Sequence, residues 1–300
     1  MKILLLGRDG QLGWELQRAL APLGRVIGLG RSAQHNPDAL CGDLDDLEGL
    51  ARTVRTLHPQ LIVNAAAYTA VDKAEAEPEK AFRINAEAPG VLAEEAHRCG
   101  AWLQHYSSDY VFDGSGDRPW KEGDATGPLN TYGSSKLAGE KAVSRYPRHV
   151  IFRTSWVYAA RGAHFAKTIL QLAAERDHLQ VVNDQFGAPT SAEMLADVSA
   201  HALRCAMQSP ELAGTYHCAA AGETSWWAYA RWTIETASRL GWNVRATPDT
   251  VTAIATTDYP TPARRPMNSR LNTDQLQSAF GVYLDDWRTG AERMLREIQP

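Results

Sequence analysis

A tyrosine and a lysine, Tyr132 and Lys136, stand four residues apart in this chain. On a helix that spacing puts both side chains on one face. A free phenol has a pKa near ~10 and exchanges protons poorly at neutral pH. A nearby ammonium lowers that pKa, which suits proton transfer to a carbonyl or from an alcohol. The ammonium has further donors for a sugar hydroxyl, such as the ribose of a nicotinamide cofactor. The alternative is a surface lysine beside a half-buried tyrosine.

The first residues predict a turn that binds nucleotide phosphates. An apolar run over Lys2–Leu6 is typical of a buried strand, and leucines at helical spacing predict a helix that begins near Gly10. Gly7, Gly10 and Gly13 lie at this junction. Glycines let the backbone approach a pyrophosphate, whose charge then lies at the positive end of the helix. The spacing is G-x-x-G-x-x-G, not the commoner G-x-G-x-x-G, and a flexible turn between core elements is the alternative.

The end of the second predicted strand, Arg25–Leu29, bears on which cofactor binds. An acid there would accept hydrogen bonds from the adenosine ribose and repel a 2′-phosphate. This chain has Gly30, Arg31 and Ser32 instead, and these residues favour NADPH over NADH. A solvated loop arginine is the alternative. Asp43 follows a little later and is predicted to face the adenine.

Two further strands are predicted to end at the same edge. The strand over 61–67 ends in small residues, which let a flat cofactor approach, and a loop over 68–75 follows it. In open α/β sheets ligands bind at the carboxyl ends of the strands. The strand over 101–107 brings Ser108 to this edge, where its hydroxyl could hydrogen-bond the carbonyl that Tyr132 protonates.

The order of elements predicts an α/β fold, a Rossmann-like doubly wound parallel sheet with a smaller α/β substrate-binding lobe. We predict a dinucleotide-binding domain over 1–155, with some later segments returning to it. Residues 156–300 would then form mainly the substrate-binding lobe. The helices and strands expected around and beyond this boundary are a long helix over 78–98, a strand over 149–155, a helix over 163–174, a strand over 179–182, helices over 192–207 and 225–240, and a final helix from Trp287.

Composition excludes several classes of protein. The 300 residues are enough for one large α/β domain or a main domain with a smaller lobe. A formal net charge of -4 argues against a nucleic-acid surface. We find no apolar run near the ~18 residues of a membrane span and no export signal, so we expect a cytoplasmic protein. The four cysteines include no C-x-x-C pair, which argues against a disulfide framework or a zinc site.

Several longer motifs resemble those of the extended short-chain dehydrogenase/reductases, and most closely the dTDP-4-dehydrorhamnose reductases among them. The resemblance covers nearly the whole chain, and the joint occurrence of the motifs is specific. The motifs lie at residues 71–75 (VDKAE), 105–112 (HYSSDYVF), 130–140 (NTYGSSKLAGE), 153–158 (RTSWVY), 183–190 (NDQFGAPT) and 265–271 (RPMNSRL).

The resemblance implies an activity and roles. The reaction would be reduction of the C4 ketone of dTDP-4-dehydro-β-L-rhamnose by NAD(P)H, the last step of dTDP-L-rhamnose synthesis. Tyr132 would donate the proton, Lys136 would bind the nicotinamide ribose, and Ser108 would take a position that is usually threonine. Gly30 departs from relatives that often have an acid, which strengthens the preference for NADPH. Cofactor contacts are expected from Gly10, Gln11, Leu12, Asp43, Leu44, Ala67, Tyr68 and Thr69. Substrate contacts are expected from Ser108, Asp109 and Trp156.

Some relatives hold magnesium between acids at a dimer contact. Glu15 and Glu193 stand at the matching positions, so a homodimer and a bound Mg²⁺ are options; two solvated charges are the alternative. Other functions of the same fold also remain. Dehydratases carry an Asp-Glu pair where this chain has Asp109 and Tyr110, which argues against dehydration. An epimerase is excluded less firmly. A regulatory subunit, like that of methionine adenosyltransferase, is disfavoured because Ser108, Tyr132 and Lys136 are all present.

Overall fold

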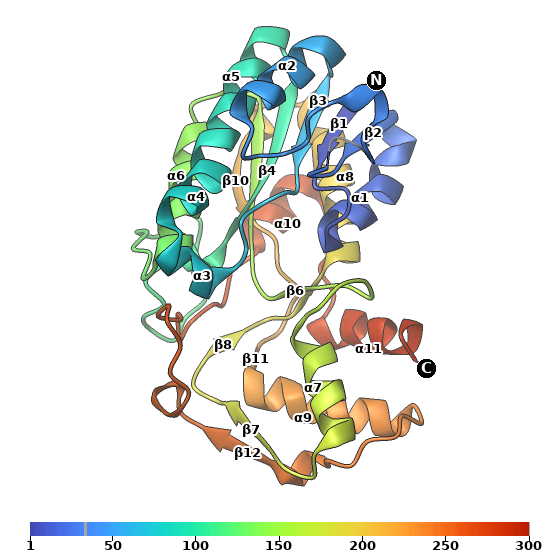
Figure 1. Cartoon of the computed structure of the whole chain (residues 1–300), viewed down its shortest axis with the longest axis vertical. Coiled ribbons are helices and arrows are strands. Elements are labelled where there is room, and N and C mark those ends of the chain that lie inside the picture. Colours follow the sequence, from blue (N-terminus) through green and yellow to red (C-terminus); the bar gives the residue numbers. More distant parts are fainter. Residues whose placement is uncertain (33–34, 300) are drawn as a thin grey trace.

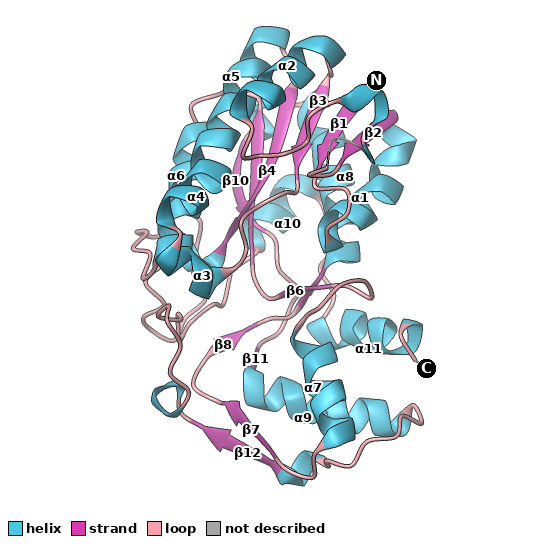
Figure 2. Cartoon of the chain, viewed as in Figure 1, coloured by secondary structure: helices cyan, strands magenta, loops and turns pink. Residues whose placement is uncertain are grey.

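The computed structural model describes residues 1–32 and 35–299. Its centre is a six-stranded sheet in the order β10-β5-β4-β3-β1-β2, in which every neighbouring pair runs parallel (Figures 1 and 2). This confirms the predicted fold class. The strands are β1 (Lys2–Leu6), β2 (Arg25–Leu29), β3 (Leu61–Asn64), β4 (Trp102–Ser108), β5 (His149–Thr154) and β10 (Gly214–His217).

Helices cover both faces of the sheet, and each layer has its own apolar core. One core joins the sheet to α1 (Gln11–Leu20), α8 (Ala192–Gln208) and α10 (Asp274–Phe280). The other joins it to α2 (Leu47–Leu57) and α5 (Ala88–Cys99), and reaches the end of α6 (Thr131–Val143). Parallel strands covered on both faces are apolar throughout, and Ile3, Leu4, Leu5 and Leu6 are all fully buried.

The remaining elements gather below the carboxyl edge of the sheet (Figure 1). Two further apolar clusters hold them together. β10, α8 and α10 come from the second half of the chain and yet pack with the sheet. The assignment of the lower group as a substrate lobe stays a prediction. Its elements are β6 (Val157–Tyr158), α7 (Phe165–Glu175), β7 (Leu179–Val182), β8 (Phe186–Gly187), β9 (Thr190–Ser191), β11 (Thr224–Ser225), α9 (Trp226–Arg239), β12 (Val251–Ile254) and α11 (Trp287–Glu297).

Some predicted boundaries were wrong. The loop expected over 68–75 contains a short helix, α3 (Val71–Ala76). The long helix expected over 78–98 is confirmed as one unbroken helical run, made of α4 (Pro78–Phe82), a π-helical turn over Arg83–Glu87, and α5. β3 ends at Asn64, three residues earlier than expected, and β10 and α10 were not predicted. Among the described residues, no helix has the combination of length and apolar character that a membrane crossing needs.

Candidate active site

Tyr132 and Ser108 meet at the carboxyl edge of the sheet. Tyr132 is in the first turn of α6, where the Asn130 side chain caps the helix by accepting a hydrogen bond from the Gly133 N–H at 2.8 Å. Ser108 ends β4, and its hydroxyl lies beside the phenol of Tyr132. A Cβ at Gly133 would lie 2.2 Å from the carbonyl oxygen of Tyr110, so only glycine lets α6 come this close.

The electrostatics of this pair differ from the sequence-based expectation. Burial raises the pKa of Tyr132, and the charge of Asp109 raises it further, while the neighbouring Ser108 hydroxyl lowers it. The Lys136 ammonium is buried and donates to the carbonyl oxygen of Tyr106 at 2.6 Å. Burial also lowers the pKa of Lys136 to about 8. The prediction that Lys136 lowers the tyrosine pKa was wrong for this geometry, because burial dominates.

Asp109 is a buried carboxylate beside the two hydroxyls. Burial raises its pKa to about 6, and hydrogen bonds from Ser269 and Ser108 oppose that shift. The hydroxyl of Ser108 donates to Oδ1 of Asp109 at 3.0 Å. Within the described part of the chain, Oδ2 of Asp109 is buried without a hydrogen-bond partner. A buried acceptor left unpaired is costly, so this oxygen suits a ligand hydroxyl.

The glycine turn before α1 fits a pyrophosphate. Gly7 has φ +84, a conformation that favours glycine, and a Cβ at Gly13 would lie 2.0 Å from the carbonyl oxygen of Gly7. The first turn of α1 begins at Gln11 after Gly10, and no side chain of the described residues caps it. Its N–H groups therefore remain available to an anion. The Gln11 amide donates to the carbonyl oxygens of Arg161 and Ala163, both at 3.3 Å.

The other predicted cofactor residues line the same edge. Arg31 is exposed after β2, Leu44 is buried, and Asp43 accepts a hydrogen bond from the Asp45 N–H at 3.1 Å. Leu12 is half-buried on α1. These positions are compatible with a dinucleotide that lies across the strand ends.

Asn85 ties the loop after β3 to the catalytic helix. Its amide accepts from the Tyr68 N–H at 2.8 Å and donates to the Tyr68 carbonyl and to the Ser135 hydroxyl, both at 3.0 Å. Ala67 is half-buried and Thr69 is exposed in this loop. The phenol of Tyr68 donates to Glu77 at 2.7 Å. The loop is therefore held beside α6 by its backbone.

The aromatic ring of Trp156, from the second half of the chain, is packed between two neighbours. Its φ of +48 is unusual for a bulky residue. Its ring stacks on Trp226 with centroids 3.5 Å apart, and a Cβ at Gly187 would lie 2.8 Å from the ring. Packing on both sides fixes the indole, and strained backbone held in this way is common at ligand sites.

Sequence reasoning assigned no role to Arg265, Tyr110 or Asp72. The Arg265 guanidinium lies 2.7 Å from Oδ2 of Asp72, and its charge lies near enough to the Tyr110 phenol to oppose the rise in the pKa of Tyr110. Tyr110 in turn packs edge-on against Tyr132, with centroids 5.4 Å apart. Arg265 is the first residue of the RPMNSRL motif, and this motif is the feature of the sequence that could have pointed to it.

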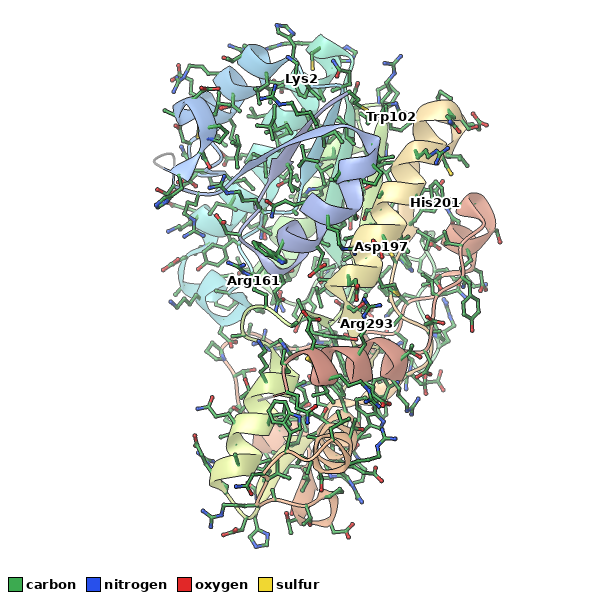
Figure 3. The ribbon with its side chains drawn as sticks, turned by 90° about the vertical axis from the view of Figure 1, so that its right-hand side faces the viewer. Lys2, Trp102, Arg161, Asp197, His201 and Arg293 are labelled. Carbon is green, nitrogen blue, oxygen red and sulfur yellow. The ribbon has the colours of Figure 1, made fainter. Side chains whose placement is uncertain are left out.

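Glu15 and Glu193 lie close together on α1 and α8. Burial raises the pKa of Glu15, Arg18 opposes that shift, and the charge of Glu193 adds to it. Each carboxylate is paired with an arginine, Glu15 with Arg18 at 3.7 Å and Glu193 with Arg293 at 2.7 Å. Figure 3 shows Arg293 on this side of the molecule. Across residues 1–32 and 35–299, no three His, Cys, Asp or Glu side chains gather as a metal site. The magnesium prediction is therefore without support.

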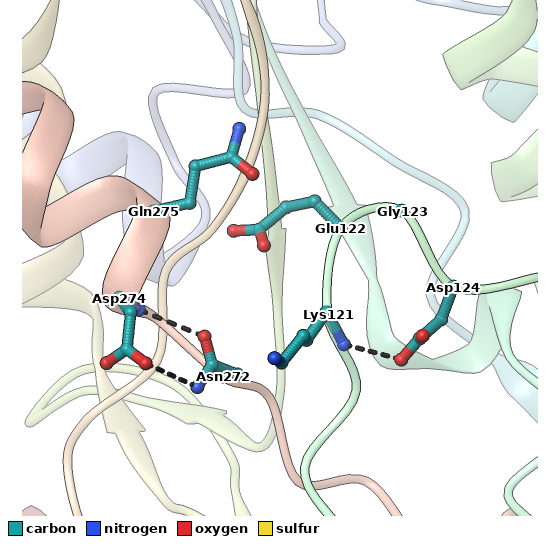
Figure 4. Close-up of a pocket in the computed structure, with 7 residues that line it drawn as sticks. All are labelled: Lys121, Glu122, Gly123, Asp124, Asn272, Asp274 and Gln275. Atoms are coloured by element: carbon teal, nitrogen blue, oxygen red, sulfur yellow. Dashed lines mark hydrogen bonds between the residues drawn. The ribbon is translucent and has the colours of Figure 1, made fainter.

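A separate pocket of about 410 Å³ lies beside α10 (Figure 4). None of the residues drawn there is a predicted site residue, and several hydrogen-bond to one another, as the Lys121 N–H does to Asp124 at 2.8 Å. We assign it no ligand. Its lining residues are Lys121, Glu122, Gly123, Asp124, Asn272, Asp274 and Gln275.

Comparison with known proteins decides the family. The sequence model of the RmlD substrate binding domain matches residues 1–299. The chain belongs to this family. It is 56% identical to dTDP-4-dehydrorhamnose reductase of Escherichia coli (strain K12), over 99% of this chain and 98% of that protein. It is 45% identical to the Burkholderia thailandensis protein of the same name, over 99% of each chain.

Solved structures of this family agree in fold. The Bacillus anthracis dTDP-4-dehydrorhamnose reductase, solved in complex with NADP, superposes with a TM-score of 0.87 at 31% identity and covers 99% of both chains. The Clostridium acetobutylicum enzyme superposes with a TM-score of 0.86 at 32% identity, over 99% of this chain and 98% of that chain. The resemblance drawn from the sequence motifs is thereby confirmed.

Proposed function

We propose that the chain reduces the C4 ketone of dTDP-4-dehydro-β-L-rhamnose to dTDP-L-rhamnose with a nicotinamide cofactor. The observation that carries the proposal is the meeting of two neighbouring hydroxyls, Tyr132 and Ser108, with the buried side chains of Lys136 and Asp109. The names of the relatives supply the substrate, and their identity extends over almost the whole chain.

The reduction needs a hydride at C4 and a proton on the ketone oxygen. The cofactor supplies the hydride when it is bound. Tyr132 holds the proton, and its raised pKa keeps the phenol protonated over the neutral range. The Ser108 hydroxyl, which donates to Oδ1 of Asp109 before substrate binds, turns to donate to the ketone oxygen as negative charge develops there. Oδ2 of Asp109 accepts from a sugar hydroxyl and so orients the ring. Lys136 remains charged up to about pH 8 and binds the ribose.

We favour NADPH as the cofactor, because Arg31 follows β2 and the Bacillus anthracis neighbour was solved with NADP. The open N–H groups at the start of α1, together with Gly7 and Gly13, would hold the pyrophosphate. NADH remains the alternative.

The rival reactions find less support. A dehydratase needs a second acid beside Asp109, and Tyr110 in that place has a pKa raised to about 12, mainly by burial. Its phenol is also engaged by Arg265. Solved dehydratases and epimerases of 19% identity share only the fold with this chain. A cytoplasmic location and a homodimer stay predictions.

The decisive experiment follows the nicotinamide absorbance band with purified protein and dTDP-4-dehydro-L-rhamnose. Oxidation of NADPH or NADH is expected. Removal of a general acid costs about 10²–10⁴-fold in rate, so Tyr132→Phe should lose activity to that extent and still bind cofactor. Tyr283→Phe is the matched control, because that side chain is 81% exposed. Folded protein that binds cofactor and oxidises none of it would contradict the proposed substrate, and an active Tyr132→Phe variant would contradict the assigned proton donor.

A further inference from the structure

The end of β2 lacks the acid that many dinucleotide-binding folds place there, because Gly30 occupies the position. The carboxylate of Asp9, from a different part of the chain, lies where the side chain of residue 30 would be. A Cβ built on Gly30 would lie 2.1 Å from Oδ2 of Asp9 and 3.3 Å from its Cγ. Asp9 belongs to the glycine turn between β1 and α1. Its carboxylate therefore occupies the volume in which a side chain at residue 30 would begin.

Neighbouring contacts hold the turn and the strand end in this arrangement. The Arg8 guanidinium lies 3.5 Å from Oδ1 of Asp9 and donates to the carbonyl oxygen of Gly28 at 2.9 Å. It also donates to the carbonyl oxygen of His35. The buried Asn36 side chain accepts from the Gly30 N–H at 2.8 Å and donates to the Gly30 carbonyl at 3.0 Å. The Asp9 side chain itself is 68% exposed, so a ligand can reach it.

We propose that Asp9 takes the place of the missing acid after β2 and reads the 2′ position of the adenosine ribose. A carboxylate there accepts a hydrogen bond from the 2′-hydroxyl of NADH and repels the 2′-phosphate of NADPH. Arg31 has the opposite effect, because its positive charge attracts the 2′-phosphate of NADPH. The two residues together set the balance between the cofactors, which Asp9 shifts toward NADH and Arg31 toward NADPH. This inference rests on the proposed function, since it assumes that a nicotinamide dinucleotide binds at this edge.

The test measures dissociation constants of NADH and NADPH, separately, by quenching of tryptophan fluorescence on the full chain. Asp9→Ala removes the carboxylate, and Asp9→Asn keeps its shape without the charge. In both variants NADPH should bind tighter relative to NADH, with a change of about tenfold in the ratio of the two dissociation constants. Glu48→Gln removes the same charge from an 84% exposed residue of α2 and should leave the ratio unchanged.

A second variant moves the carboxylate from the turn to the strand. Asp9→Ala combined with Gly30→Asp removes the atom that a residue-30 side chain would meet, so the new side chain has room. The double variant should recover the relative affinity for NADH that Asp9→Ala loses. An unchanged ratio in Asp9→Ala and Asp9→Asn, from protein that binds both cofactors, would overturn the role of Asp9 and leave the reductase proposal intact. Folded wild-type protein that binds neither cofactor would overturn the proposed function and this inference together.

Discussion

The buried carboxylate of Asp109 should weaken the fold at neutral pH. Its pKa is raised from 3.8 to about 6, chiefly by burial. Below pH 3.8 the group is protonated in both the folded and the unfolded states and costs nothing. Between pH 3.8 and about 6 the unfolded chain ionises first, so unfolding releases a proton and stability falls as pH rises. Above about pH 6 the full cost is present, about 3 kcal/mol for a shift of about two pKa units.

Asp109→Asn should remove this cost. The amide stays neutral, so the free energy of unfolding of the variant, minus that of the wild type, should become more positive by about 2 kcal/mol from pH 4 to pH 7. Urea unfolding of both proteins at several pH values measures this difference. Activity should fall in the same variant, because an amide presents only one acceptor oxygen to the sugar and to Ser108.

Two comparisons sharpen the result. Ser269→Ala removes a hydrogen bond that lowers the pKa of Asp109, so the wild-type pH dependence should shift to higher pH. Asp124→Asn should give the opposite sign, and between about pH 2 and pH 4, because hydrogen bonds from Arg118 lower the pKa of Asp124 to about 2. A difference between Asp109→Asn and wild type that stays constant from pH 4 to pH 7 would refute the reasoning, because it would mean that burial does not shift this carboxyl.

Three other perturbations test the site. Gly13→Ala brings a methyl group to 2.0 Å from the Gly7 carbonyl oxygen, which should lower stability by about 1–3 kcal/mol and weaken cofactor binding. Thermal unfolding and cofactor titration measure the two effects. Gly123→Ala is the control, because its Cβ would meet nothing within 4 Å, and it should change neither quantity. The pH profile of kcat/KM should be level between about pH 6, where Asp109 titrates, and about pH 8, and should fall above pH 8 as Lys136 loses its charge; a rate that stays level to pH 10 would contradict the role of Lys136. Arg265→Met should lower kcat about tenfold with cofactor affinity unchanged, a loss that Arg264→Met, at an exposed position, should not reproduce.

Local patterns in the sequence predicted those parts of the fold that local interactions decide. β2 and β7 begin and end at the predicted residues. β10 was missed because it is a short strand in which only Tyr216 and His217 are buried. Its strand conformation comes from pairing with β5, a contact that the local sequence does not encode. α3 was missed because no side chain of the described residues caps it.

In the candidate site too, local spacing was predictable and long-range contacts were not. Tyr132 and Lys136 were predicted as a pair because four residues on a helix fix their relation. The contact between Arg265 and Asp72 joins residues 193 positions apart, and no periodicity predicts such a pair. The direction of the Tyr132 pKa was missed for a related reason, since burial depends on the whole fold and not on the spacing to Lys136. The individual site assignments stay predictions until variants test them.

The place of β10 at the edge of the sheet affects how the protein can be made. A ribosome that has translated only the first 155 residues has delivered five of the six strands, and the outer edge of β5 is still unpaired at that stage. Unpaired edges of this kind recruit other strands and aggregate. Synthesis must pass residue 217 before that edge is covered, and α10, which completes one core, comes later still. A fragment cut at residue 155 would therefore be an aggregation-prone folding intermediate and not an independent domain.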